Sequence, residues 1–203
     1  MSAPSAPRSE NVVWERSEIG RQERWAAIGQ RGATIWLTGL PASGKSTLAK
    51  ALEVDLINRG RLAYRLEGDN LRHGLCGDLG FSAGDREENV RRTAHVARLM
   101  ADAGAVVIVA LVSPFQASRD AARAMHEADG LRFVEVFVDT PLEECERRDP
   151  KGLYAKARAG ELKRMTGIDG AYEPAPAAEL RLRPPWTVAE AVGWVLDLVA
   201  AET

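Results

Sequence analysis

The chain has 203 residues, about the size at which one hydrophobic core serves a single domain. Its 45% hydrophobic and 28% charged residues are ordinary for a soluble globular protein, and its net charge of −2 does not indicate nucleic-acid binding. No apolar run is long enough to cross a membrane. From the charge and the run lengths together, we expect neither nucleic-acid nor membrane partners. Residues 1–10 are rich in Ser, Ala and Pro and predict a disordered tail, with residues 11–203 forming one cytoplasmic domain.

Apolar runs and amphipathic runs alternate along the rest of the chain, which predicts alternating strands and helices. The expected strands are 33–37, 62–66, 105–112, 133–138 and, more weakly, 179–182. The expected helices are 48–59, 82–103, 117–128, one opening at a capping box at 140–143 with Pro141 at its first position, and one after a second capping box at 187–190. Before them, residues 11–32 carry Trp14 and Trp25 amid charges and predict a short amphipathic segment packed on the domain edge. Such alternation predicts a three-layer α/β domain with a mainly parallel five-stranded sheet.

Cysteine and histidine are too few and too scattered to predict a metal site. Cys76 and Cys145 fit no metal motif, and we expect both to be reduced thiols. The histidines, His73, His95 and His126, are expected on the solvated surface.

Residues 38–47 read TGLPASGKST and fit the phosphate-binding pattern G-x-x-x-x-G-K-[ST] between an expected strand and an expected helix. In such a loop the backbone N–H groups face the phosphates, and the helix that follows adds the positive end of its dipole. We expect Lys45 to neutralise the β- and γ-phosphates and the Ser46 hydroxyl to bind Mg²⁺. The expected ATP contacts within the loop are Gly39, Leu40, Pro41, Ala42, Ser43, Gly44, Lys45, Ser46 and Thr47. The fold is therefore predicted to be that of a P-loop NTPase or kinase.

The position of the acidic residues distinguishes this chain from motor and switch NTPases. Motor and switch NTPases usually end an apolar strand in an Asp that helps to hold Mg²⁺, but here the third strand runs into Ser113 without a carboxylate. The acids instead follow the second strand, in the sequence EGDN at 67–70. A carboxylate at that strand end lies beside the phosphate loop, where it either orients Mg²⁺ or takes a proton from an acceptor hydroxyl. The alternative is that EGDN is only a turn.

Basic residues mark the other parts of the expected site. Arg72 and Arg86 lie at the same sheet edge as the phosphate loop and imply an anionic acceptor, whereas Arg91 and Arg92 are expected on a solvated helix face. A basic, glycine-punctuated stretch at about 147–172 predicts a mobile lid that closes over the triphosphate and excludes water. The alternative is a basic helix exposed to solvent.

Together these motifs resemble the adenylylsulfate (APS) kinase family, in stretches from residue 11 to about 180. The most specific are DLGFSAGDREENVRR at 78–92, and RDPKGLYAKARAGE at 148–161 followed by TGID at 166–169. The resemblance implies transfer of the γ-phosphoryl group of MgATP to the 3′-hydroxyl of APS, which gives 3′-phosphoadenylylsulfate. It also implies a homodimer with functional coupling to ATP sulfurylase.

The resemblance also assigns roles to single residues at matching positions. Asp69 would be the base or the carboxylate that orients Mg²⁺, so the expected metal ligands are Ser46 and Asp69. Ser113 matches a serine proposed in some family members to carry a phosphoenzyme; we favour a pocket-lining role, because in-line transfer needs no protein nucleophile. Lys45, Asp69 and Ser113 are the candidate catalytic residues, and Arg148 joins the ATP contacts. The candidate acceptor contacts are Asp69, Arg72, Phe81, Arg86, Asn89, Val112, Ser113, Lys151 and Met165.

Some positions depart from the family pattern. Glu67 stands where the family mostly has Asp, Cys76-Gly77 replace the usual Asn-Arg, and Met165 replaces an aromatic residue. These changes bear on affinity more than on reaction type. Two other functions stay open: a P-loop kinase for another small molecule, and a non-catalytic nucleotide-binding partner, against which the intact Lys45, Ser46 and Asp69 argue.

Overall fold

The computed structural model describes residues 11–13, 15 and 17–200, and in them five strands form one sheet. The strands are β1 (Ala33–Thr38), β2 (Ala63–Glu67), β3 (Val106–Ala110), β4 (Arg132–Val138) and β5 (Leu180–Leu182). Their order is β2-β3-β1-β4-β5, and every pairing within the described residues is parallel. Each predicted strand overlaps an observed one, and the predicted parallel α/β sheet is confirmed.

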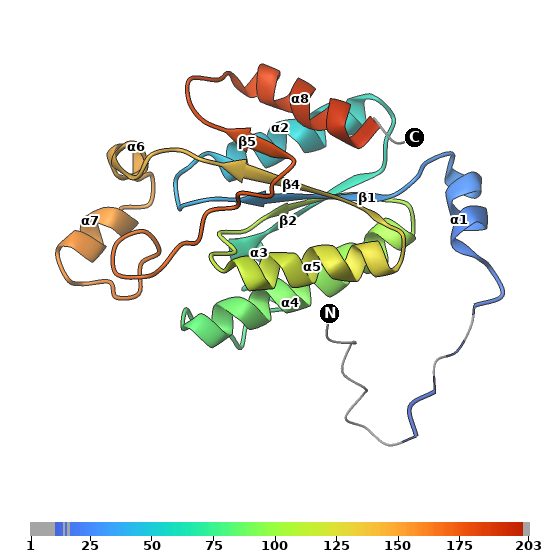
Figure 1. The fold of residues 1–203 in the computed structure, drawn as a ribbon, viewed down its shortest axis with the longest axis horizontal. Helices are drawn as coiled ribbons and strands as arrows, with labels where there is room; N and C mark the ends of the chain where they lie inside the picture. The colour runs from blue at the N-terminus through green and yellow to red at the C-terminus, as the bar shows by residue number, and fades with distance from the viewer. Residues whose placement is uncertain (1–10, 14, 16, 201–203) are drawn as a thin grey trace.

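Helices cover both faces of this sheet (Figure 1). They are α1 (Arg21–Ile28), α2 (Lys45–Asn58), α3 (Gly68–Leu71), α4 (Ala83–Asp102), α5 (Gln116–Ala128), α6 (Leu142–Arg148), α7 (Leu153–Arg158) and α8 (Val188–Ala200). Helices α2 and α8 lie on one face, and α4 and α5 lie on the other. Strand β1 is buried along its whole length, with Ile35 and Leu37 in one core and Trp36 in the other, because successive side chains point to opposite faces.

Two predicted helix starts have the expected local chemistry and one does not. Ser82 caps α4 in a reciprocal capping box with Asp85, and Thr187 forms one with Glu190 before α8. The capping box predicted at 140–143 is wrong, because the Thr140 hydroxyl donates instead to the Ser43 carbonyl, 2.8 Å away in the phosphate loop. Consequently α6 begins one residue later than expected, with Pro141 as its N-cap rather than its first helical residue.

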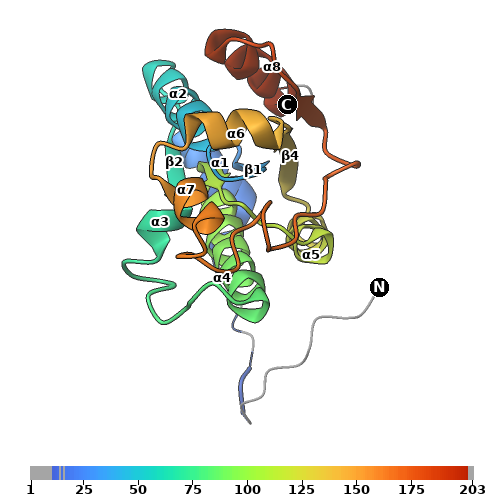
Figure 2. The ribbon, with the colours of Figure 1, turned by 90° about the vertical axis from the view of Figure 1, so that its left-hand side faces the viewer.

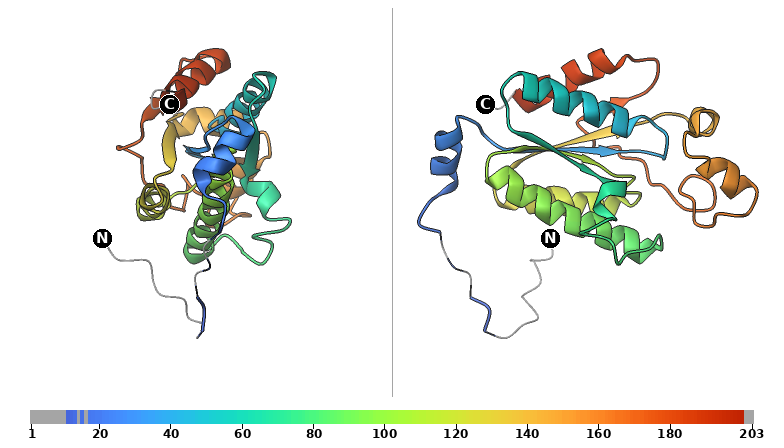
Figure 3. Two further views of the ribbon diagram at one scale, coloured as in Figure 1. Left: turned by 90° about the vertical axis from the view of Figure 1, so that its right-hand side faces the viewer. Right: turned by 180° about the vertical axis from the view of Figure 1, so that it is seen from behind.

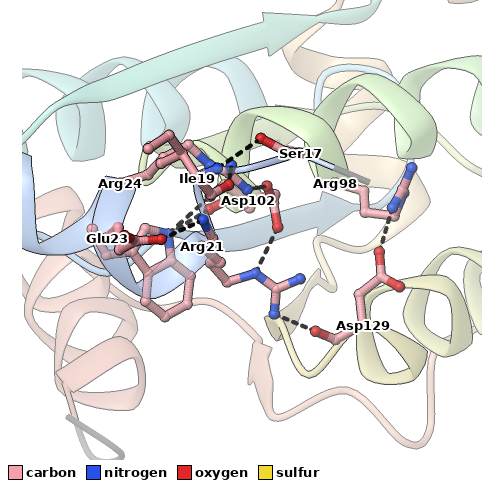
Figure 4. A network of polar contacts seen from close by, with 11 residues as sticks. Ser17, Ile19, Arg21, Glu23, Arg24, Arg98, Asp102 and Asp129 are labelled. Carbon is pink, nitrogen blue, oxygen red and sulfur yellow. Dashed lines mark hydrogen bonds and ion pairs between the residues drawn. The ribbon is translucent and has the colours of Figure 1, made fainter. Parts of the chain in front are cut away.

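The amphipathic segment before β1 packs on the domain edge, as expected. Arg21 and Arg24 both form ion pairs with Asp102 at the end of α4, and the Trp25 indole N–H donates to the Asp102 carbonyl at 3.0 Å (Figure 4). Arg98 pairs with Asp129 beside this network. The predictions for residues 1–10 and Trp14 lie outside the described residues. Helix α1 lies at the opposite end of the sheet from α6 and α7 (Figures 1 and 3).

One surface prediction is wrong. His126 is fully buried: its Nδ1 lies 2.8 Å from the Ala122 carbonyl and its Nε2 lies 3.0 Å from the Thr34 hydroxyl, so burial lowers its pKa. Arg92 lies on a partly exposed helix face, where it pairs with Asp78 and Glu88 and ties the loop before α4 to that helix. No helix in the described part of the chain combines the length and the apolar character that crossing a membrane requires.

Candidate active site

The predicted site residues gather at the carboxyl ends of the strands. Figure 2 looks toward this end, where α3, α6 and α7 surround the start of α2. This is the edge at which open parallel sheets bind ligands. The same edge carries the phosphate loop after β1, the acidic segment after β2 and the loop after β3.

The phosphate loop joins the end of β1 to the start of α2. Gly39 has a φ of +148°, and a Cβ there would lie 2.6 Å from the Val138 carbonyl oxygen, so only glycine fits. The Lys45 ammonium donates to the carbonyls of Gly39 at 2.8 Å and Leu40 at 2.6 Å. Burial lowers the pKa of Lys45 to about 8, against the opposing influence of Cys145 and Glu67. A buried cation is therefore held at the mouth of a loop with the geometry to bind phosphates.

The carboxylate next to the Ser46 hydroxyl is Glu67 rather than Asp69. The Ser46 hydroxyl donates to Glu67 Oε1 at 2.6 Å, while Arg65 holds the other oxygen of Glu67 at 2.9 Å. Asp69, on α3, forms an ion pair with Lys151 from the segment after α6. The predicted metal ligands, Ser46 and Asp69, therefore have different polar partners. Hydroxyl and carboxylate oxygens are the protein ligands that suit Mg²⁺, so Ser46 and Glu67 fit such an ion.

Glu67 is a functional candidate that the sequence signalled only weakly. It ends β2 and serves as the N-cap position of α3, so EGDN is a strand end followed by one helical turn rather than an isolated turn. The observation that could have found it is its position as the last strand residue beside the phosphate loop.

An exposed aromatic ring with two guanidinium groups close to it lies at the predicted acceptor side. Phe81 is 56% exposed, with the Arg72 guanidinium carbon 4.2 Å and the Arg86 guanidinium carbon 5.5 Å from its ring centroid. Burial and the neighbouring charge of Arg72 lower the pKa of Arg86. Arg86 also donates to the Arg164 carbonyl at 3.1 Å. Two adjacent cations beside an exposed ring have the chemistry to hold an aromatic ligand with an anionic group.

Two other predicted acceptor residues are more deeply placed. Asn89 is buried on α4 beside the thiol of Cys76. Ser113 is also buried and adopts a left-handed φ of +38°, a conformation that costs a non-glycine residue about 1–3 kcal/mol. Its hydroxyl accepts a 3.1 Å hydrogen bond from the Trp36 indole. The Ser113 hydroxyl is engaged in the core, which favours the structural reading over a nucleophile.

The segment predicted as a lid has a small core of its own. Cys145, Tyr154 and Met165 are buried together, and Leu40 of the phosphate loop packs against them. The Tyr154 hydroxyl donates to the Pro41 carbonyl at 3.0 Å. Met165, predicted among the acceptor contacts, is only 5% exposed, and its side chain fills this core. A short helix and a loop cannot be ordered without such apolar contacts, and flexible Met fills irregular gaps well.

Arg148 and Trp186 lie together against the start of α2. A Cβ at Gly44 would lie 3.6 Å from the Trp186 ring and 3.8 Å from Arg148 Nη1. Arg148 is oriented by Glu144, whose carboxylate accepts from its Nε at 2.8 Å. Arg148 was expected among the ATP contacts, but Trp186 was not. The only sign of it in the sequence is a lone aromatic residue in the loop RPPW after the last strand.

A phosphate loop on a parallel sheet, an acid at the end of β2 and a basic lid-like segment packed on the loop define a P-loop kinase. Comparisons with known proteins specify the family. The profile described as adenylylsulphate kinase matches residues 31–183. An adenylyl-sulfate kinase of Klebsiella pneumoniae subsp. pneumoniae is 54% identical over 194 residues, which are 96% of each chain. One from Yersinia pestis is 53% identical over 190 residues, 94% of this chain and 88% of its own.

The solved structures agree. The Mycobacterium tuberculosis APS kinase in complex with AMPPNP and APS is 54% identical with a TM-score of 0.81, covering 84% of this chain and 98% of that one. A hexameric APS kinase from Thiobacillus denitrificans is 31% identical with a TM-score of 0.64, covering 85% of this chain and 29% of that one. The chain belongs to the adenylylsulfate kinase family.

Proposed function

We propose that this protein transfers the γ-phosphoryl group of MgATP to the 3′-hydroxyl of adenylylsulfate and releases 3′-phosphoadenylylsulfate and ADP. The observation that carries this function is the exposed Phe81 ring between Arg72 and Arg86. Such a cluster suits an acceptor that combines a nucleobase with a sulfate–phosphate group. The similar Mycobacterium tuberculosis APS kinase is in complex with AMPPNP and APS, which have the chemistry of this donor and this acceptor.

On the donor side, the loop 39–47 binds the triphosphate through its backbone N–H groups. Lys45, already held within the loop, neutralises charge on the β- and γ-phosphates. The residues that would hold Mg²⁺ are Ser46 and Glu67, with Asp69 oriented toward the same ion or toward the acceptor. The ion supplies charge neutralisation for the transferring group.

On the acceptor side, Asp69 accepts the proton of the attacking 3′-hydroxyl or orients that hydroxyl for in-line attack. Lys151, its ion-pair partner, brings positive charge from the lid-like segment to the same point. Asn89 and Val112 complete the acceptor pocket together with the Arg72–Phe81–Arg86 cluster. Ser113 lines this pocket, with its hydroxyl accepting a bond from Trp36, and in-line transfer needs no phosphoenzyme.

The base of ATP lies between the Arg148 guanidinium and the Trp186 indole. Both groups lie against Gly44 of the phosphate loop. The segment at about 147–172 acts as a mobile lid, with Met165 at its core and Lys151 facing the reacting groups. Its closure excludes the water that would compete for the phosphoryl group.

We further propose a cytoplasmic homodimer in which residues 11–203 form one domain, with functional coupling to ATP sulfurylase. The exposed apolar residues Val12, Val13 and Ile19 support an interface near the first part of the chain. Light scattering coupled to gel filtration tests the assembly: a mass of one chain would contradict the dimer.

The test of the reaction is a coupled assay of ADP release with and without APS, with product identification by mass spectrometry. We expect ADP release that depends on APS and a product heavier than APS by one phosphoryl group. A panel of other alcohols separates this function from the rival small-molecule kinase. Lys45→Met provides the background. If APS accepts no phosphate while another alcohol does, the proposed acceptor is wrong, and no ADP release with any acceptor supports the non-catalytic alternative.

A further inference from the structure

Arg119 is a fully buried charged residue that the proposed mechanism does not use. It lies on α5 with 1% of its side chain exposed, and its Nε is 2.8 Å from Glu135 Oε1 on β4. Glu135 is also buried, and that burial raises its pKa despite the two neighbouring arginines, Arg119 and Arg123. Because a buried guanidinium must find partners for several N–H groups, the rest of its contacts define its role.

The remaining N–H groups of Arg119 bind the backbone of two loops. Its Nη1 donates to the Ser113 carbonyl at 2.7 Å. Its Nη2 donates to the carbonyls of Glu173 at 2.9 Å and Pro174 at 3.0 Å. One side chain therefore joins residues 112–116, here called the acceptor loop, to residues 172–174, here called the lid anchor because they begin where the lid ends.

Further bonds connect the same two segments. The Glu173 N–H donates to the Pro114 carbonyl at 2.8 Å, and the Glu173 carboxylate accepts from the Gln116 N–H at 2.6 Å. The Tyr172 hydroxyl lies 3.0 Å from the Thr38 hydroxyl, which itself donates to the Val112 carbonyl at 2.8 Å. These bonds involve the exposed Glu173 or hydroxyl groups. Arg119 differs from them because it is a buried charged group that binds both segments.

The acceptor loop needs such support because of its backbone. Ser113 has a φ of +38°, a conformation that a serine keeps only where its surroundings enforce it. Arg119 and Thr38 bind the carbonyls on this turn, and Trp36 binds the Ser113 hydroxyl. A planar guanidinium can hold Ser113, Glu173 and Glu135 in fixed directions at once, which a lysine ammonium at the same position cannot.

We propose that Arg119 is a positioning residue that fixes the acceptor loop relative to the lid anchor, so that the lid closes in register with the bound acceptor. Only the kinetic test of this role, through the KM of APS, rests on the proposed function. The competing explanation is that the Arg119–Glu135 pair merely stabilises the packing of α5 on β4. The two explanations differ in what a charge-conserving substitution does.

The test variant is Arg119→Lys, which keeps a cation opposite Glu135 but loses the fork to the three carbonyls. The matched control is Arg123→Lys, since Arg123 lies on the same helix as Arg119 and pairs with the same Glu135, and with Glu179, but is bonded to neither loop. Both variants are measured for melting temperature, for kcat and for the KM values of APS and ATP. Tryptic cleavage within the lid, which holds seven basic residues between Arg147 and Arg164, is followed with and without MgAMPPNP, with fragments identified by mass.

We expect Arg119→Lys to raise the KM of APS by about tenfold, with the KM of ATP changed by less than about twofold, because misplacement of a positioning element acts on one substrate. The protection of the lid by MgAMPPNP should fall in the same variant and stay intact in Arg123→Lys. Equal melting temperatures with unchanged APS kinetics and unchanged protection would overturn the proposal.

If Arg119→Lys is poorly folded, the double variant Arg119→Gln with Glu135→Gln removes both buried charges and keeps the side chains polar. Arg119 has a purely structural role if Arg119→Lys and the double variant both lose activity only in proportion to their loss of folded protein. The protection assay needs only nucleotide binding. It therefore tests the lid coupling even if the wild-type protein fails to phosphorylate APS, an outcome that would instead contradict the proposed acceptor.

Discussion

The two halves of the site are built in different ways. The phosphate-binding part of the donor half is contained in residues 39–47, which run from the end of one strand into one helix. The acceptor half brings together Arg72 from the end of α3, Phe81 from the loop before α4, Arg86 from α4 and Lys151 from the lid segment. A contiguous loop can be recognised from its sequence because its geometry is local. A dispersed pocket depends on tertiary contacts between distant residues. Each of these residues can be substituted separately, so the pocket leaves no contiguous pattern in the sequence.

The substitution expected to have the largest effect acts where the halves meet. Asp69→Asn should retain MgATP binding and lower kcat by about 10²–10⁴-fold, because an amide cannot accept the proton of the acceptor hydroxyl. The measurements are kcat and the Kd of MgAMPPNP. Asp78→Asn is the control, since Asp78 is an exposed carboxylate that pairs with Arg92. Normal turnover of Asp69→Asn would show that Asp69 is neither base nor metal-orienting group.

A substitution confined to the acceptor half should separate the two substrates. Arg86→Ala should raise the KM of APS by about 10–100-fold, which is the loss of one or two hydrogen bonds to a charged group, and leave the Kd of MgAMPPNP nearly unchanged. Arg91→Ala provides the control, because Arg91 is on the same helix but exposed and paired with Glu88. A parallel loss of ATP affinity would show that the halves are not independent.

The donor half should respond to pH through Lys45. Its pKa is about 8 before nucleotide binds, and phosphate groups must raise it in the complex. Affinity for MgAMPPNP is therefore full below about pH 8 and falls as the pH rises further, by up to about tenfold per pH unit. Calorimetry from pH 7 to 9 checks this, and Lys45→Arg should lose the slope because its guanidinium stays charged. A flat profile in the wild type would show that Lys45 keeps its proton throughout.

The smallest effect is expected at the base of the donor nucleotide. Trp186→Leu should raise the Kd of MgAMPPNP by about 2–10-fold through loss of aromatic stacking, with the KM of APS unchanged. Trp194→Leu is the control, as Trp194 is partly exposed on α8. Equal affinities in the two variants would remove Trp186 from the site.

The sequence predicted the sheet well because apolar strands buried on both faces leave little ambiguity. Local capping predictions succeeded at Ser82 and Thr187, where nothing competes for the side chain. The prediction failed at Thr140, where the hydroxyl binds Ser43 in a loop 97 residues away along the chain. His126 was placed on the surface for a similar reason, since no local pattern shows that Thr34 and the Ala122 carbonyl will satisfy both ring nitrogens.

For this protein the residue pattern alone determined the fold class, the phosphate loop with Lys45 and Ser46, and the anionic character of the acceptor. Each of these follows from chemistry within a short stretch of chain. Only the tertiary structure decided that Glu67, rather than Asp69, contacts Ser46, that Met165 fills the lid core, and that Arg119 joins two loops. These contacts join residues far apart in the chain, so their geometry exists only once the sheet and its helices have packed.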